Sequence, residues 1–119
     1  MPLIPDDLKK RLLDNGRFNR HWSEADGRTI DFKPLVKLFN PCGAATWLLS
    51  ELDPDDPDIA FGLCDLGAGE PELGYVSLAE IEGYKGPLGI GIERDLSFTA
   101  TQSLTAYAKE ARIHRRIIA

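Results

Sequence analysis

The spacing of apolar and polar positions predicts strands through the middle of the chain and helices at its two ends. Strand side chains alternate between two faces, whereas helix positions recur every three to four residues. We therefore expect strands over residues 32–39, 46–52, 58–66, 73–76 and 89–98. We expect helices over residues 5–15 and 77–83, and a last helix of about four turns capped by Thr101 or Ser103.

Turn-forming residues separate these runs. Asn40-Pro41-Cys42-Gly43 joins the first two strands, and Asp53-Pro54-Asp55-Asp56-Pro57 ends the second. Gly16 is expected to end the first helix. Residues 16–31 lack a clean period and predict a loop or an irregular turn of helix, in which Phe18 and Trp22 can meet because they are four apart.

The order of these elements predicts an α+β fold. We expect a single antiparallel sheet of about four to five strands, with the N- and C-terminal helices packed on it. The length of 119 residues suits a single domain over residues 1–119. In the strand at 46–52, alternation places Trp47, Leu49, Glu51 and Asp53 on one face. In the strand at 58–66, the small residues Ala60, Gly62 and Cys64 share a face that suits a closely packed helix.

Charge is unevenly distributed along the chain. Residues 51–95 carry twelve acidic and two basic side chains, while the flanking segments have a small basic excess. The acidic middle argues against a broad phosphate-binding face there, because nucleic-acid affinity rests largely on neutralised phosphates. The acidic start predicts no signal peptide, and no apolar run reaches the length of a membrane span, so we expect a cytoplasmic protein. Cys42 and Cys64 are expected to be reduced and packed.

Several segments together resemble a bacterial and phage domain family of unknown function that occurs on plasmids and other mobile elements. The resemblance covers about residues 33–98 and rests on Asn40-Pro41, on the stretch from Trp47 to Asp53-Pro54, and on Gly91-Ile92-Glu93-Arg94-Asp95-Leu96. The family has no assigned reaction, so the resemblance implies an accessory role on mobile elements and no catalytic residues.

Two carboxylate doublets are the sharpest chemical feature. Glu51-x-Asp53 and Glu93-x-Asp95 each place two acids on one side of a strand, and neighbouring strands would bring four carboxylates together. Such a site would suit Mg²⁺, Mn²⁺ or Ca²⁺ and a metal-dependent hydrolase. The alternative, which we favour, is solvated strand ends with Arg94 paired to one of the acids. The predicted binding residues are Trp47, Glu51, Asp53, Glu93, Arg94 and Asp95, with no metal, cofactor or catalytic residue assigned.

Other motifs have ordinary structural explanations. A nucleophilic Cys42 would need His21 or His114 as a base, and neither has a diagnostic spacing. The glycine-rich run 86–91 fails the dinucleotide pattern, because Arg94 stands where the third glycine belongs. The acidic run 53–58 suits a turn better than a mimic of phosphate spacing.

These observations predict a non-enzymatic interaction module with a protein partner. The first alternative is the metal-dependent hydrolase. The second is a nucleic-acid-binding module that uses Trp22, its neighbours Arg17, Arg20 and His21, and the basic residues of the last helix. No membrane contact is predicted, and the oligomeric state is left open.

Overall fold

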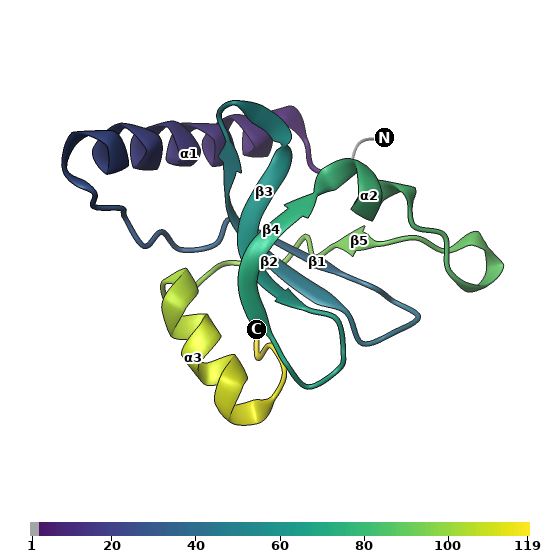
Figure 1. Ribbon diagram of the computed structural model, residues 1–119. Helices are drawn as coiled ribbons and strands as arrows, with labels where there is room; N and C mark the ends of the chain where they lie inside the picture. Colours follow the sequence, from purple (N-terminus) through teal and green to yellow (C-terminus); the bar gives the residue numbers. More distant parts are fainter. Residues whose placement is uncertain (1–2) are drawn as a thin grey trace.

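A computed structural model describes residues 3–119 and shows a five-stranded antiparallel sheet with helices on both faces (Figure 1). The strand order is β4-β3-β2-β1-β5. The strands are β1 (Val36–Phe39), β2 (Thr46–Asp53), β3 (Asp56–Asp65), β4 (Glu72–Ser77) and β5 (Glu93–Arg94). The helices are α1 (Asp6–Asp26), α2 (Leu78–Gly83), the 3-10 turn η1 (Pro87–Gly89) and α3 (Leu104–His114). The predicted α+β class, the single sheet and both terminal helices are confirmed.

Two apolar cores lie on the two faces of the sheet. The first joins α1 and α2 to one face and contains Ile4, Leu12, Val36, Leu38, Trp47, Leu49, Leu52, Ala60, Leu78 and Ile81. The second joins α3 to the other face and contains Leu48, Leu63, Leu104, Tyr107, Ala108 and Ala111. Each fully buried leucine contributes about 1.5–3 kcal/mol to folding. Consecutive residues Leu48 and Leu49 serve different cores, as expected for an interior strand covered on both sides.

A β-bulge at Ser50 reverses the alternation of β2. Leu49 pairs with Gly62 and Glu51 pairs with Phe61, so Ser50 has no partner of its own on β3. A bulged strand carries one extra residue, which moves every later side chain to the other face. Trp47 and Leu49 therefore face α1, whereas Glu51 lies on the face of Phe61. The prediction that Trp47, Leu49, Glu51 and Asp53 share one face is wrong for this reason.

Helix α1 does not end at Gly16 as predicted but continues to Asp26, where Gly27 with φ 79° terminates it. Gly16 is buried against β2, and a Cβ there would lie 1.8 Å from the Leu52 carbonyl oxygen. Glycine is required for close approach of the two backbones, not for a turn. Phe18 and Trp22 do meet across one helical turn, with ring centroids 6.0 Å apart.

The predicted strand over residues 89–98 is mostly absent, and only Glu93–Arg94 pairs with β1. Gly89 has φ 73°, so the backbone still turns at the first residue of the predicted strand. Ile92 packs with the core under α1, whereas Phe98 packs with the core under α3, and Leu96 is 79% exposed. The regular alternation assumed for this segment therefore does not hold.

Helices α2 and α3 begin at residues that the sequence predicts as helix caps. The Ser77 hydroxyl accepts the Glu80 N–H at the start of α2, and Gly83 is its last residue. Ser103, rather than Thr101, caps α3 by accepting the Ala106 N–H. Helix α3 has 11 residues, about one turn fewer than predicted. In the part of the chain that the structure describes, none of the helices has the length and apolar character needed to cross a membrane.

Candidate functional site

The structure distributes the predicted binding residues over three separate places. Trp47 forms the floor of an apolar groove on the α2 side of the sheet. Glu51 lies on the opposite face, beside Phe61. Glu93, Arg94 and Asp95 lie at the outer strand β5.

The two carboxylate doublets do not converge. Strand β1 separates β2 from β5, and the ladder places Glu93 level with Phe39 and Thr46, away from the Glu51 end of β2. Among residues 3–119, no group of three or more His, Cys, Asp or Glu side chains is close enough to hold a metal ion. The four-carboxylate arrangement that the hydrolase alternative requires is therefore not formed.

Asp53, Arg94 and Asp95 have structural partners. Asp53 accepts a hydrogen bond from Arg20 at 3.2 Å, and Lys37 lies 3.5 Å from Asp95. The Arg94 Nε donates to the Leu3 carbonyl at 3.2 Å, so Arg94 ties the N-terminal segment to β5. The expected pairing of Arg94 with one of the acids is not found among the ion pairs of residues 3–119.

The apolar groove is a concave surface with a volume of about 440 Å³. Trp47 is its floor, and its walls are Val76, Ile81, Tyr84, Ile92 and Leu66. Asn40, Ser77 and Glu80 add polar groups at its margin. An apolar cavity with a few polar groups is the usual form of a binding site.

Strands β2 and β4, helix α2 and neighbouring loops build the groove. Trp47 is held in β2 between its ladder partners Leu38 and Cys64, and only 7% of its surface is exposed. The position of α2 is fixed by Asp58, which accepts the Ser77 hydroxyl at 2.6 Å and the Ala79 N–H at 2.9 Å. These bonds keep the pKa of Asp58 below its ordinary value. The acidic run 53–58 therefore has structural partners through Asp53 and Asp58.

Beside the groove, residues 84–92 form a projecting arm, which extends away from the sheet between α2 and β5 (Figure 1). The arm closes on itself, because the Gly86 N–H donates to the Ile90 carbonyl at 2.8 Å and the Ile90 N–H donates to the Pro87 carbonyl at 3.1 Å. At its tip Leu88 is 98% exposed and has φ 58°. The glycine-rich run therefore builds this arm, as a structural interpretation predicts.

Leu88 combines two unfavourable features. A left-handed backbone costs a residue with a Cβ about 1–2 kcal/mol. A fully exposed leucine also forgoes the stabilisation of burial. Residues with such backbone angles are enriched at binding and switch sites.

Most of the groove and arm was missed from the sequence. Only Trp47 was among the predicted binding residues, while Ile81, Tyr84, Ile92 and Leu66 were read as packing or loop positions. The usable signal was the apolar content of 84–92 together with four glycines at 83, 86, 89 and 91, because a glycine-rich segment with large apolar residues leaves those side chains exposed.

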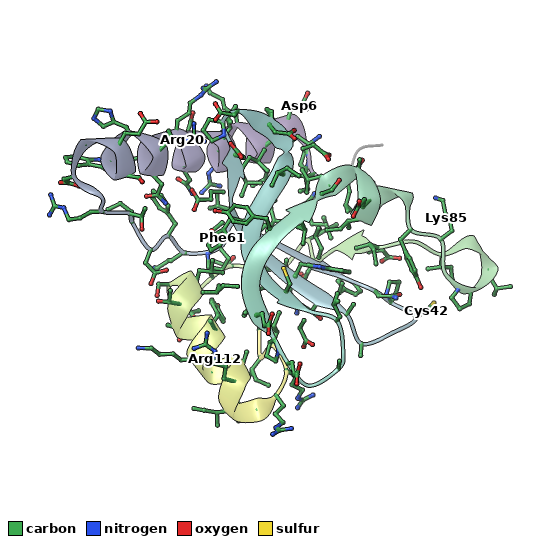
Figure 2. The ribbon with its side chains drawn as sticks, viewed as in Figure 1. Asp6, Arg20, Cys42, Phe61, Lys85 and Arg112 are labelled. Atoms are coloured by element: carbon green, nitrogen blue, oxygen red, sulfur yellow. The ribbon has the colours of Figure 1, made fainter. Side chains whose placement is uncertain are left out.

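The cysteines and the basic-aromatic cluster lie elsewhere. Cys42 is exposed at the tip of the β1–β2 turn, far from α1 and α3, which carry His21 and His114 (Figure 2). Cys42 is thus exposed rather than packed, contrary to the prediction. Burial raises the pKa of the Cys64 thiol to about 11, so this thiol stays protonated at neutral pH.

Trp22 stacks with Phe18, and the Arg28 guanidinium lies 5.9 Å from its ring centroid. Arg20 is held by Asp53 and Asp55. Trp22 lies in α1, whereas the last arginines of the chain lie in α3 or directly after it. The two helices pack on opposite faces of the sheet. The surface proposed for nucleic acid is therefore split between two layers.

Comparison with known proteins gives one match. A family model described as a protein of unknown function, DUF2958, matches residues 3–118. The searches of curated proteins and of solved structures found no match. The matched range takes in α1 and α3, which lie outside the resemblance over residues 33–98.

Proposed function

The chain belongs to the DUF2958 family, whose function is unknown, and we propose that it is a non-enzymatic protein-binding module. The apolar groove receives an apolar side chain of the partner, and the arm contacts the partner beside it. The single observation that carries this proposal is the groove floored by Trp47 beside an exposed, strained Leu88.

The apolar side chains around the groove support the proposal. Leu66 is 72% exposed, and Tyr84, Ile90 and Leu88 are also exposed large apolar residues. Leu66 and Tyr84 line the groove, and Leu88 and Ile90 lie on the arm next to it. A group of exposed apolar residues at a concave site indicates a protein or ligand contact, whereas scattered single ones do not.

Charge specifies the partner further. Helix α2, which supplies one wall of the groove, carries Glu80 and Glu82 and no lysine or arginine. Glu80 lines the groove itself. A partner segment with one large apolar side chain flanked by basic residues therefore complements this surface, and opposite charges at the rim speed its association.

We also propose a setting for this binding. The segments that resemble a plasmid- and phage-borne family support a cytoplasmic accessory role in bacteria that carry mobile elements. The partner would then be a protein encoded by the element or by its host.

The binding proposal can be tested with displayed peptides. Short peptides in which every position is randomised are displayed as a library. Peptides that bind the wild-type protein are then recovered. We expect recovered peptides to carry a large apolar residue flanked by lysine or arginine. Leu66→Asp places a charge on the groove wall and should weaken these peptides at least about tenfold, the equivalent of about 1.4 kcal/mol.

Leu96→Asp is the matched control. Leu96 is exposed to a similar extent, at 79%, and does not line the groove. The Leu96→Asp substitution should leave the affinity for the recovered peptides unchanged within a factor of about two. Recovery of peptides without an apolar anchor, or equal weakening by both variants, would refute the groove as the binding site.

A further inference from the structure

A second cleft lies on the face of the sheet opposite the apolar groove. Glu51 in β2 is the cross-strand partner of Phe61 in β3, and Phe61 is the partner of Tyr75 in β4. Directly opposed residues of antiparallel strands point to the same face. The three side chains therefore form a row across three strands, with the Phe61 and Tyr75 ring centroids 5.1 Å apart.

The cleft over this row, which we call the Glu51 cleft, has a volume of about 280 Å³. Its other walls are the segment 29–32 that follows α1 and the first residues of α3, Leu104 and Thr105. Figure 2 shows Phe61 on the side of the sheet between α1 and α3. This volume admits the head and part of the alkyl chain of an arginine or lysine, and is small for a larger ligand.

The Glu51 carboxylate is held in place by a neutral donor. Asn19 Nδ2 lies 3.3 Å and 3.2 Å from its two oxygens. Asn19 also binds the Ile30 backbone, accepting its N–H at 2.6 Å and donating to its carbonyl at 3.0 Å. The carboxylate is therefore oriented by a side chain that is itself fixed at both ends.

No cation of the described residues neutralises Glu51, since none of the ion pairs within residues 3–119 includes it. Arg20, the basic residue of the adjoining surface, binds Asp55 at 2.6 Å and Asp53 at 3.2 Å. Asp31 adds a second carboxylate at the cleft, held by the Thr105 N–H and hydroxyl. The cleft thus has a net negative charge.

A half-buried carboxylate next to two aromatic rings is suited to an organic cation. The carboxylate supplies a charge-assisted hydrogen bond. The ring faces attract the delocalised charge of a guanidinium or the ammonium of an alkylamine. A hard metal ion would require six or more oxygen ligands, which the rings do not provide.

We propose that the Glu51 cleft binds an alkylguanidinium or alkylammonium group, supplied by a free amine compound or by an arginine or lysine of another protein. Glu51 and Phe61 do not line the apolar groove and face away from its floor, whereas Tyr75 lies at the edge of the sheet and lines both sites.

The Asn19 side-chain amide gives a direct readout of binding. Ethylguanidinium, butylammonium and the neutral ethylurea are titrated separately into the ¹⁵N-labelled protein. The two cations should give a saturable shift of the Asn19 Nδ2 resonances, and ethylurea should give none. Glu51→Gln keeps the shape of the side chain and removes its charge, so it should weaken cation binding at least about tenfold.

Two matched variants separate the site from general charge effects. Glu93→Gln removes one exposed carboxylate of β5 and should leave the affinity within a factor of about two. Tyr75→Leu keeps an apolar side chain at a position that is 71% exposed and should weaken ethylguanidinium binding severalfold by removing a ring face. Saturation by ethylurea, or equal weakening by Glu51→Gln and Glu93→Gln, would overturn the proposal, as would a lack of saturation by both cations.

The tripeptide Gly-Arg-Gly, amidated and acetylated at its ends, distinguishes the two sources of the cation. Tighter binding than ethylguanidinium indicates a side chain of a protein, and equal or weaker binding indicates a free compound. This test uses no apolar anchor, so its result is separate from the outcome of the peptide selection at the groove.

Discussion

Gly16 shows how a single missing side chain sets the distance between a helix and the sheet. A Cβ at this position would lie 1.8 Å from the Leu52 carbonyl oxygen and 3.0 Å from its carbon. Backbone atoms of an interior strand cannot move aside as the end of a side chain can. The helix must therefore shift to accommodate any larger residue.

We predict that Gly16→Ala lowers the free energy of unfolding by about 1–3 kcal/mol, the usual cost of overpacking. This is the opposite of the normal effect of alanine in a helix. Gly83→Ala in α2 is the control, because a Cβ at Gly83 has nothing within 4 Å. Urea unfolding of both variants measures the difference. A Gly16→Ala protein as stable as the control would contradict the close packing of α1 on β2.

Glu51 makes stability depend on pH. Burial raises the pKa of Glu51 above its ordinary value, and the hydrogen bond from Asn19 opposes this only in part. The folded state therefore binds the proton more tightly than the unfolded state does. Protonated Glu51 therefore contributes to the free energy of unfolding. This contribution is complete below the ordinary pKa of a glutamate and is lost as the pH rises through the raised pKa of the folded state.

We predict that Glu51→Gln, which stays neutral, lacks this loss. The unfolding free energy of the variant minus that of the wild type should increase between about pH 4 and about pH 7. Urea unfolding at both pH values gives the two differences. A difference that stays constant or decreases with pH would show that Glu51 is not desolvated by folding.

Helix α2 depends on a shared capping residue at its first turn. The Ser77 hydroxyl donates to Asp58 of β3 and accepts the Glu80 N–H. With only six residues, α2 has little helical stability of its own. Its position, and with it one wall of the apolar groove, depends on these bonds and on the burial of Leu78 and Ile81.

We predict that Ser77→Ala lowers the free energy of unfolding by about 1 kcal/mol, the typical cost of losing an N-cap. Ser97→Ala, at an exposed serine, should stay within about 0.5 kcal/mol of the wild type. Thermal and urea unfolding compare the two. A neutral Ser77→Ala would mean that packing alone holds α2.

The arm of residues 84–92 exposes Leu88 at the cost of backbone strain. Asparagine tolerates the left-handed conformation better than leucine does, because its short polar side chain can hydrogen-bond locally. Leu88→Asn should therefore raise the free energy of unfolding by up to about 1 kcal/mol. The same change should weaken the selected peptides severalfold.

Leu96→Asn provides the comparison for this prediction. Leu96 is exposed, and its backbone is not among those with positive φ. It should change neither stability nor peptide affinity appreciably. Unaltered peptide binding by Leu88→Asn would remove the arm from the binding surface while leaving the groove in place.

The two faces of the sheet carry different sites, an apolar groove on one and an acidic cleft on the other. The bulge at Ser50 lets β2 contribute a side chain to each of them. Ahead of the bulge, Trp47 points toward the apolar groove. Beyond it, Glu51 points toward the cleft on the other face. Asn15 Nδ2 donates to the Ser50 carbonyl at 2.9 Å, so a polar residue of α1 satisfies a backbone group within the bulge.

The sequence was sufficient for the fold class, for the approximate positions of the first four strands and for the two ends of α2. These features rest on local alternation and on turn residues such as Pro54-Asp55, which forms the β2–β3 turn. Trp47 was also identified as a binding residue, although its groove was not.

Three features were missed, two because they depend on contacts between distant segments and one because it depends on local backbone angles. Gly16 resembles a helix stop until β2 is seen beside it. The bulge at Ser50 leaves no local signal, because its carbonyl partner Asn15 lies 35 positions away. Residues 89–92 of the arm retain the alternating pattern of a strand, but the positive φ angles of Leu88 and Gly89 close the arm into a turn.

The most direct test of the proposed binding surface is the fluorescence of Trp47 during peptide binding. Trp22→Phe leaves Trp47 as the single tryptophan of the chain. Titration with a selected peptide should change the Trp47 emission in a saturable manner, and Leu66→Asp should abolish that change. A peptide that binds with full affinity while the Trp47 emission stays constant would contradict the groove as the site of partner binding.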